Sequence, residues 1–400
     1  MSDAARPLRT VGTPGIDEPV EERGRAILTP LIEPAETWTL AEGASWAVRR
    51  DPARFERVFL AADSGDLGGA EAMLLRMAEV LRELGVDVTV VVPAPSPLLD
   101  EAVRRRVPVI GLAARNRYLW IWALRRWDRE RPDGLLWCNG LVPSLATVRR
   151  AGRLVHLHQE PTGIRWILSP LARRGAVATL VPSRAMLEAV PDALVLPNWT
   201  ERIRRAKPDP DTNGRIRIGF LGQLGLEKGV HVLADAVALL EERMPDRFRL
   251  VLAGEPEAVR EEDLVVMEDA LGAVARLTHR AGWVDAADFF DTIDLLVVPS
   301  VIPESFGLVA AEAMAARVPL IVSDAGALPE VVGGAAQVVP AGNAAALADR
   351  IADVVTGAIS PHRGPLFERW FAEFSPVAGE ARMRELVDAL GVRRGEQSRL

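Results

Sequence analysis

The feature that most constrains the fold is an alternation of short apolar runs with amphipathic stretches, which occurs twice along the chain. The first series has strand-like runs at 57–63, 87–93, 107–112, 134–139, 153–159, 178–183 and 194–198. The second series has them at 215–222, 248–254, 292–300, 318–324 and 335–340. Buried strands that alternate with helices are typical of a parallel sheet with helices on both faces. The sequence therefore predicts two doubly wound, Rossmann-like α/β domains facing each other across a cleft.

A charged, Pro-rich stretch that ends in Asn-Gly separates the two series and reads as a linker. We expect helices at about 70–84, 230–243, 257–275, 307–316 and 377–391, where apolar residues recur with helical spacing. The predicted organisation is an N-terminal extension, a first domain, the linker, a second domain and a closing helical segment, at residues 1–54, 55–205, 206–214, 215–368 and 369–400.

Composition narrows the class of protein. Apolar residues make up 49% of the chain and charged residues 26%, as in soluble globular proteins. Cys138 is the only cysteine, which excludes an internal disulfide framework and a cysteine-based metal cluster. No apolar run reaches the roughly 18 residues of a membrane span, and the N-terminus lacks the apolar core of a secretory signal. We therefore expect a cytoplasmic protein.

Positive charge is concentrated in the first half of the chain. Residues 101–185 contain sixteen arginines and five acidic residues, whereas the whole chain carries a net charge of −7. Such an asymmetry predicts a basic face that meets something anionic. Within it, the stretch 115–133 mixes arginines with Trp120, Trp122 and Trp127. It reads either as a basic aromatic helix on an anionic membrane or as a helix that packs its aromatic face on the sheet, and we favour packing.

Two glycine loops occupy strand-to-helix junctions. One is GFLGQLGLEKG at 219–229, with Gly222, Gln223 and Lys228. Glycines let a ligand approach the backbone, free N–H groups at a helix start attract anions, and the lysine adds a full positive charge. A diphosphate is the natural ligand of such a loop, although a tight turn with an exposed lysine would look the same. The other loop, Gly68-Gly69, is a weaker candidate for the same phosphates.

The stretch PESFGLVAAEAM at 303–314 carries two carboxylates, Glu304 and Glu312. Glu312 lies among alanines, valine and methionine, where an unpaired charge is costly unless it binds something polar, such as the hydroxyls of a ribose. The N–H groups of a helix start could hold phosphate or sugar hydroxyls, and they belong to Ser305, Phe306, Gly307 and Leu308. Taken alone, both glutamates could equally be solvated surface residues.

Several ordered motifs together resemble the retaining glycosyltransferases of family 4, which have the GT-B fold. PESFGLVAAE matches that family's pair of glutamates separated by seven residues, and AMAARVPLIVSDAGALPEVV continues its pattern. GQLGLEKG resembles its phosphate loop, LGGAE its N-terminal glycine loop, and PSRAM and LPN its remaining landmarks. FSPVAGEARM resembles its final crossover helix, which returns to the first domain. The resemblance spans about residues 57–390.

The resemblance implies a role for each of these residues. Glu312 would bind the ribose of a nucleotide diphosphate sugar and Lys228 its diphosphate. Glu304, with the amides near Phe306 and Gly307, would bind the transferred sugar. His158 would contact the sugar near the reacting carbon, although His156 lies on the same face of the strand and leaves the assignment between them open.

The sequence departs from the family pattern at three positions. Gln223 stands where the family usually has arginine, which predicts weaker donor binding or a substitute arginine from elsewhere. Arg317 and Ala327 stand where the family usually has glycine, and Ala327 could narrow the pocket around the sugar. These departures bear on the identity of the donor and leave the reaction class unchanged.

Metal-dependent chemistry has one candidate pattern, Asp209-Pro210-Asp211, and we interpret it as an accident of the linker. We expect catalysis without a metal, with Lys228 and helix amides neutralising the leaving diphosphate. No cofactor is expected, since the nucleotide diphosphate sugar is a co-substrate. The expected acceptor is a glycan, a lipid-linked or a small molecule. Nucleic acid is not expected, and a peripheral contact with the inner face of the membrane is left open.

The sequence therefore predicts a glycosyltransferase that acts with retention, a property that the resemblance alone implies. A sugar-nucleotide epimerase or a phosphorylase of the same architecture is the rival enzyme class. The rival without catalysis is a nucleotide- or carbohydrate-binding protein on a degenerate transferase scaffold. The presence of Lys228, Glu304 and Glu312 argues against that last alternative.

Overall fold

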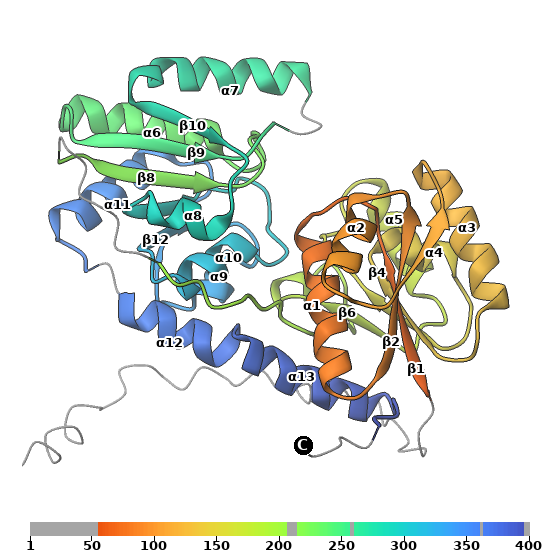
Figure 1. The fold of residues 1–400 in the computed structure, drawn as a ribbon. Coiled ribbons are helices and arrows are strands. Elements are labelled where there is room, and N and C mark those ends of the chain that lie inside the picture. Colours follow the sequence, from red (N-terminus) through yellow and green to blue (C-terminus); the bar gives the residue numbers. More distant parts are fainter. Residues whose placement is uncertain (1–54, 206–213, 257–259, 361–362, 396–400) are drawn as a thin grey trace, which may run out of the picture. The chain divides into compact units, whose positions relative to one another are not determined.

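The computed structural model describes residues 55–205, 214–256, 260–360 and 363–395, and it contains two parallel sheets flanked by helices (Figure 1). The predicted fold class is confirmed. The expected N-terminal extension at 1–54 and nearly all of the expected linker, including Asp209 and Asp211, lie outside the described residues. No helix among the described residues is long and apolar enough to cross a membrane.

The first sheet has seven strands in the order β3-β2-β1-β4-β5-β6-β7. Its strands are β1 (Arg57–Ala62), β2 (Asp87–Ala94), β3 (Val109–Ala113), β4 (Leu135–Asn139), β5 (Arg153–His156), β6 (Ala178–Val181) and β7 (Leu194–Val195). Its helices are α1 (Gly69–Glu83), α2 (Pro97–Arg104), α3 (Arg117–Glu130), α4 (Leu141–Ala146), α5 (Ile164–Arg173) and the 3-10 helix η1 (Ala185–Leu187). We call these elements the N-terminal domain.

The second sheet has six strands in the order β10-β9-β8-β11-β12-β13. Its strands are β8 (Ile216–Leu221), β9 (Phe248–Ala253), β10 (Thr278–Gly282), β11 (Leu295–Val298), β12 (Leu320–Ser323) and β13 (Gln337–Val339). Its helices are α6 (Val230–Arg243), α7 (Glu261–Ala273), the 3-10 helix η2 (Ala275–Leu277), α8 (Ala286–Asp291), α9 (Leu308–Ala315), α10 (Leu328–Val332) and α11 (Ala344–Thr356). We call these elements the C-terminal domain.

Each sheet is buried on both faces, which is why its strands read as continuous apolar runs. In β1, Leu60 and Ala61 point to opposite faces, and both are fully buried, in different apolar clusters. Burial of this kind stabilises the folded state by roughly 25 cal/mol for each Å² of apolar surface that is removed from water. A sheet covered by helices on both sides leaves only its strand ends open for a ligand.

The helix α3 packs on the sheet, as the sequence analysis favoured, but its tryptophans face different sides. Trp120 is 2% exposed, and its indole N–H donates to the carbonyl of Ala62 at 3.1 Å. Trp127 meets Phe59 edge to face, with ring centroids 5.1 Å apart. Trp122 is 67% exposed. Trp120 and Trp122 therefore cannot share one function, contrary to a reading of the whole segment as a single aromatic face.

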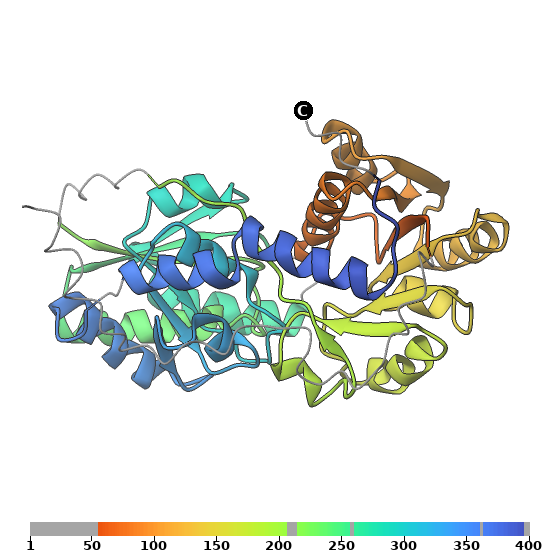
Figure 2. The same cartoon turned by 90° about the horizontal axis from the view of Figure 1, so that it is seen from below.

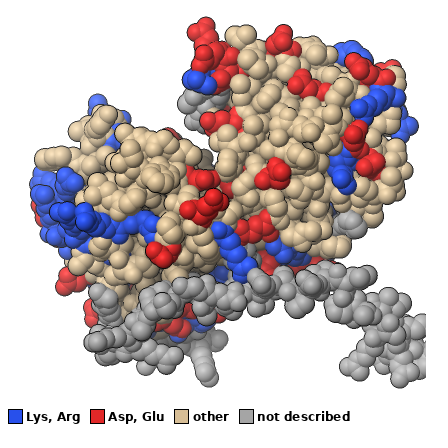
Figure 3. Space-filling model, turned by 180° about the vertical axis from the view of Figure 1, so that it is seen from behind, with Lys and Arg blue, Asp and Glu red and all other residues tan. Residues whose placement is uncertain are grey.

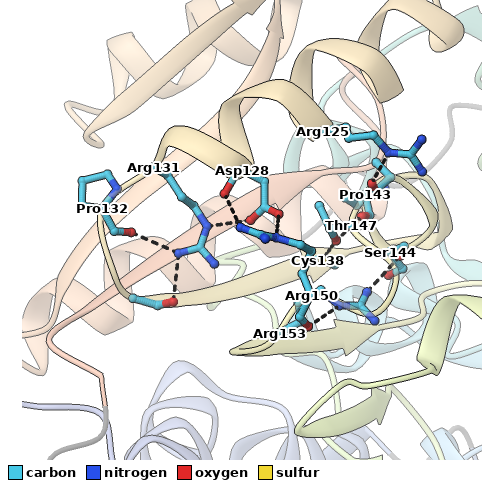
Figure 4. Close-up of polar contacts among 12 residues, drawn as sticks. Arg125, Asp128, Arg131, Pro132, Cys138, Pro143, Ser144, Thr147, Arg150 and Arg153 are labelled. Atoms are coloured by element: carbon cyan, nitrogen blue, oxygen red, sulfur yellow. Dashed lines mark hydrogen bonds and ion pairs between the residues drawn. The ribbon is translucent and has the colours of Figure 1, made fainter.

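Three arginines, of which Arg131 and Arg153 are buried and Arg150 is half-exposed, hold α3, α4 and α5 against one another (Figure 4). The carboxylate of Asp128 on α3 accepts from Nε of Arg131 at 2.8 Å and from Nε of Arg150 at 2.9 Å. Arg153 on β5 is fully buried, and its guanidinium donates to four backbone carbonyls, those of Ser144, Arg150, Ala172 and Arg174. Because each buried donor finds an acceptor, these charges fix the helix ends at low cost. The positive charge counted in the sequence is thus partly structural.

Two consecutive helices, α12 (Arg363–Glu373) and α13 (Pro376–Ala389), return the chain to the first domain (Figures 1 and 2). The expected single helical segment at 369–400 thus starts earlier and is divided at Ser375 and Pro376, where proline follows an N-cap serine. Trp370 and Phe374 belong to the core of the C-terminal domain. Met383 and Leu386 belong to the core of the N-terminal domain, where α13 lies against α1.

The departure at Arg317 has a visible backbone consequence. This residue has φ 57°, in the left-handed region that glycine adopts without strain. Its guanidinium lies 4.0 Å from the centroid of the Phe367 ring. A cation–π contact of this kind is worth about 0.5–1 kcal/mol at an exposed site, comparable with the cost of the backbone conformation.

Candidate functional site

The predicted site residues lie at the carboxyl ends of the central strands of both sheets. The strand order reverses between β1 and β4 in the N-terminal domain and between β8 and β11 in the C-terminal domain. At such a reversal the connections leave in opposite directions and open a crevice at the strand ends, where doubly wound folds bind ligands. Gly68, Asn139, Gly222 and Ser300 all follow closely after one of these four strands, or end it.

The loop after β8 is shaped by glycines that no other residue could replace. Gly222 has φ 143°, and Gly229, the N-cap of α6, has φ 74°. A Cβ on Gly229 would lie 1.9 Å from the carbonyl oxygen of Pro299, so the backbone of the two loops is in direct contact. No side chain caps α6, which leaves its first N–H groups available to an anion. Gln223 is exposed in this loop.

Lys228 and Glu304 form an ion pair in this loop. The ammonium of Lys228 donates to Oε1 of Glu304 at 2.6 Å, and the hydroxyl of Ser300 donates to the same oxygen at 2.6 Å. The side chain of Lys228 is 36% exposed and that of Glu304 is 16% exposed. The sequence analysis assigned the two residues to different parts of the donor and did not foresee that they would pair. A ligand phosphate that takes Lys228 would compete with Glu304.

The segment 305–308 leads into α9 as predicted. Gly307 is the N-cap of α9 with φ 88°, and no side chain caps the helix. A Cβ on Gly307 would lie 2.4 Å from Leu328, so only glycine fits. Phe306 is 3% exposed and meets Phe374 edge to face at 5.4 Å between centroids, which leaves only its backbone for a ligand. Leu308, half-buried, belongs to the apolar surroundings of α9.

Glu312 lies inside α9, between alanines that are fully buried. Burial raises the pKa of its carboxyl to about 7, and Arg76 on α1 opposes the shift. A carboxyl with a pKa near 7 is about half protonated at neutral pH in the absence of a ligand, because Arg76 offsets only part of the cost of burying its charge. Arg76 also donates to the carbonyl of Trp199 at 3.2 Å. Arg76 is a candidate for the arginine that would substitute for the one missing at Gln223. The existence of such a substitute stays a prediction.

The structure distinguishes between the two histidines. His156 ends β5, is fully buried, and neither of its ring nitrogens has a hydrogen-bond partner. His158 follows the strand and lines a cavity of about 190 Å³, and its Nε2 lies 2.7 Å from Oδ1 of Asn139. The two rings lie in contact, tilted by 43° with their centroids 3.9 Å apart. His158 is therefore the residue that faces the candidate site, and burial lowers its pKa to about 4, which keeps the ring neutral.

The two domains meet at His158. The hydroxyl of Ser305 donates to the backbone carbonyl of His158 at 2.6 Å. The glycine loop of the N-terminal domain approaches the same region, since a Cβ on Gly69 would lie 3.6 Å from the side chain of Leu308. The glutamate-bearing segment, His158 and the loop Gly68-Gly69 are thus brought together as the sequence analysis expected.

The start of α1 is already occupied by a carboxylate. Glu71 is 7% exposed and accepts hydrogen bonds from the backbone at Gly68 and from its own N–H group, while burial raises its pKa. This is one half of a capping box, in which the residue three positions into the helix reaches back to the cap; the cap itself, Gly68, has no side chain to supply the other half. A phosphate at Gly68 and Gly69 would have to compete with this side chain.

The cavity of about 190 Å³ belongs to the N-terminal domain and is lined by charged and polar side chains that sequence reasoning missed. Asp63 and Glu71 face it with carboxyls whose pKa burial raises, and Arg117 and Arg165 oppose that shift for Asp63. Asp63 also accepts from the backbone N–H of Val142 at 2.7 Å and so caps α4. Strand ends such as Asn139 are the one sequence signal that could have pointed to this cavity. Among the described residues, no cluster of three or more His, Cys, Asp or Glu side chains could hold a metal ion.

Comparison with known proteins agrees with this geometry. Residues 67–205 match glycosyltransferase family 4, and residues 215–356 match glycosyl transferases group 1. The chain is 34% identical to a D-inositol 3-phosphate glycosyltransferase of Corynebacterium urealyticum, over 68% of this chain and 78% of that protein. It is 29% identical to the phosphatidyl-myo-inositol mannosyltransferase of Mycobacterium leprae, over 71% of this chain and 83% of that protein.

Solved structures share the fold. The Anabaena protein Alr3699/HepE, solved in complex with UDP-glucose, has a TM-score of 0.71 at 19% identity and covers 83% of this chain and 99% of its own. Sucrose-phosphate synthase from Thermosynechococcus elongatus has a TM-score of 0.68 at 19% identity, with 84% of this chain and 99% of its own covered. The two family matches, the similar relatives and the shared fold agree. The chain therefore belongs to the family 4 glycosyltransferases of GT-B fold.

Proposed function

We propose that this glycosyltransferase uses a nucleotide diphosphate sugar, bound mainly by the C-terminal domain, and transfers the sugar with retention and without a metal. The observation that carries the proposal is the pairing of Lys228 with Glu304 between the uncapped starts of α6 and α9. A cation and two helix starts favour a diphosphate, and Glu312 beyond them suits the ribose. Displacement of Glu304 by the phosphate would free its carboxylate for the sugar.

Thermal unfolding with UDP-, GDP-, ADP- and dTDP-sugars tests the donor. A ligand at about 100 times its Kd stabilises the folded state by about 2.7 kcal/mol, so the matching base should raise the Tm clearly. If none of these donors raises the Tm, the proposal fails. Anomeric configuration of the product, followed by NMR, then tests retention, and turnover in EDTA tests metal independence. Activity lost in EDTA and restored by Mg²⁺ or Mn²⁺ would contradict the latter.

For the acceptor we propose a polyol that carries a phosphate. The cavity in the N-terminal domain combines carboxyls that accept from hydroxyls with two exposed arginines, Arg117 and Arg165, at the first turns of α3 and α5. Arginine is well suited to phosphate because its donors form a fork. Two relatives are named for inositol phosphates, one of them lipid-linked. Arg117→Ala should raise the KM for myo-inositol phosphate and leave the KM for the donor unchanged.

We further propose that the enzyme works in the cytoplasm, with the N-terminal domain touching an anionic membrane surface. Apolar side chains are exposed on α3 and α5, among them Trp122, Trp166 at 64% and Ile167 at 71%. Arginines flank them in the sequence of both helices, and Figure 3 shows Lys and Arg side chains gathered on this domain, at the left of that view. Exposed aromatic residues beside cations suit the boundary between lipid headgroups and acyl chains. A lipid-linked acceptor would be presented there.

A further inference from the structure

Asn139 links the start of α1 to His158 through both ends of its amide. The side chain is fully buried at the end of β4. Its Nδ2 donates to the carbonyl of Ala70 at 3.1 Å, and its Oδ1 lies 2.7 Å from Nε2 of His158. These contacts join three elements that are far apart in the sequence, α1, β4 and the segment after β5.

The chemistry of the three groups fixes where the hydrogen atoms lie. A backbone carbonyl can only accept, so the amide must turn its NH₂ end toward Ala70. The amide oxygen then faces His158, and this oxygen can also only accept. Nε2 of His158 must therefore carry a hydrogen, and in a neutral ring Nδ1 is left with a lone pair.

We propose that Asn139 is a positioning residue, which holds His158 in the neutral Nε2–H tautomer and keeps Nδ1 as an acceptor for a substrate hydroxyl. This inference rests on the proposed function, because the hydroxyl would come from the transferred sugar or the acceptor. Nδ1 is buried and has no hydrogen-bond partner in the described structure, although His158 lines the cavity. A buried acceptor without a partner is costly, and a ligand hydroxyl would satisfy it.

The surroundings of His158 favour the neutral ring. Neither nitrogen of His156, whose ring lies against that of His158 at a tilt of 43°, has a partner that would supply or remove a proton. An aspartate at position 139 would stabilise an imidazolium and would lose the donor to Ala70. Asparagine accepts from Nε2 without attracting a second proton, which is what a hydrogen-bond acceptor at Nδ1 requires.

The tautomer is read from the ¹⁵N chemical shifts of the histidine rings in the free, full-length protein, with His158→Gln to assign the signals. Wild-type His158 should show a protonated Nε2 and an unprotonated Nδ1. Asn139→Ala should move both shifts toward the average of the two tautomers, whereas Asn343→Ala, which removes an equivalent side-chain hydrogen bond at the N-cap of α11, should not.

Kinetics supply the second readout. Misplacement of a group at a reacting centre costs up to about 100-fold, so Asn139→Ala should lower kcat by roughly 10- to 100-fold and leave the KM for donor within about threefold. A hydrogen on Nδ1 in the wild type, or unchanged shifts and kcat in Asn139→Ala, would overturn the inference. If the wild type transfers no sugar, the proposed function fails. The ¹⁵N shifts of His158 would still show whether Asn139 fixes its tautomer, because they do not depend on turnover. The spectrum of the wild type alone can refute the inference, so the test stands even if Asn139→Ala does not fold.

Discussion

The two halves of the site satisfy their polar groups in different ways. In the C-terminal half, Glu304 accepts from both Lys228 and Ser300, and the loops that carry them lie in backbone contact. In the N-terminal half, both nitrogens of His156 and Nδ1 of His158 are buried without a partner, beside carboxyls whose pKa burial raises. Lys228 and Glu304 of the first half are thus paired before any ligand binds. The second half contains Nδ1 of His158, a residue of the cavity lining whose acceptor a substrate hydroxyl would satisfy, so it is the half in which ligand chemistry should matter most for stability.

The largest effect expected on the N-terminal half comes from its packing. Trp120→Ala should cost about 3–5 kcal/mol of stability, because it removes a buried aromatic side chain from the apolar cluster between α3 and the sheet. Trp122→Ala, two residues away on the exposed side of α3, should change stability by no more than about 0.5 kcal/mol. Thermal melting of the two variants tests this contrast.

The same pair tests the membrane contact. Trp122→Ala should reduce sedimentation with anionic vesicles at low salt, and high salt should release the wild type. Equal losses of Tm for both variants would show that α3 is buried on both sides, and the proposed membrane surface would then be wrong.

The next effect concerns the charged pair of the C-terminal half. Glu304→Ala should lower kcat by about 10²–10³, since its carboxylate would stabilise positive charge that develops as the diphosphate departs. Glu262→Ala, on the exposed first turn of α7, is a matched control. Steady-state kinetics decide the matter once circular dichroism shows that both variants are folded. A kcat within about threefold of the wild type would refute the role of Glu304.

Removal of the other partner should act on binding instead. Lys228→Ala should weaken binding of the nucleoside diphosphate by about 1.5–3 kcal/mol more than it weakens binding of the nucleoside. Part of this loss would come from the unpaired carboxylate of Glu304, so Lys228→Ala combined with Glu304→Gln should bind diphosphate better than Lys228→Ala alone. Calorimetric titrations with both ligands measure it; identical losses would place Lys228 away from the phosphates.

The smallest effect is a pH dependence of Glu312. Ribose hydroxyls donate to an ionised carboxylate, so donor binding should release a proton from a group whose pKa is about 7 in the free protein. The KM for donor should therefore rise about tenfold per pH unit below pH 7, and Glu312→Gln should give a flat, weaker profile.

The protonation of Glu312 should also make the free energy of unfolding depend on pH. The raised pKa means that the folded state holds an extra proton between the ordinary value of 4.5 and about 7, so stability falls as pH rises through that window. Glu312→Gln should consequently gain stability relative to the wild type above pH 7 and not below pH 4.5. A wild-type KM that does not vary between pH 6 and 8 would argue against Glu312 as the ribose ligand.

Sequence reasoning succeeded where one local pattern determines the structure. The helix expected at 230–243 is α6, with the same bounds. The two loop motifs singled out Lys228, Glu304 and Gly307, which lie close together in the structure. It failed where tertiary context decides. The strand β10 was missed because it lies at the edge of its sheet and reads THRAG, with little apolar periodicity. Edge strands need not be apolar on both faces.

The same distinction explains the candidate site. Each predicted site residue of the C-terminal half belongs to one of two contiguous segments, 219–229 and 303–314, which a motif can describe. Asn139, Asp63 and Arg76 come from separate elements, and each is unremarkable in its own segment. Only the strand order places Asn139 between α1 and His158, and only contact between the domains brings Arg76 close enough to Glu312 to influence its pKa.

The path of α12 and α13 has a consequence for synthesis. The chain leaves the N-terminal domain before residue 206, builds the whole C-terminal domain, and then contributes Met383, Leu386 and Val387 to the first core. The domain that emerges first from the ribosome is therefore the last to be complete. Until α13 has been translated, the apolar surface of α1 that it covers stays open, so the nascent chain carries an unfinished domain while the second one folds.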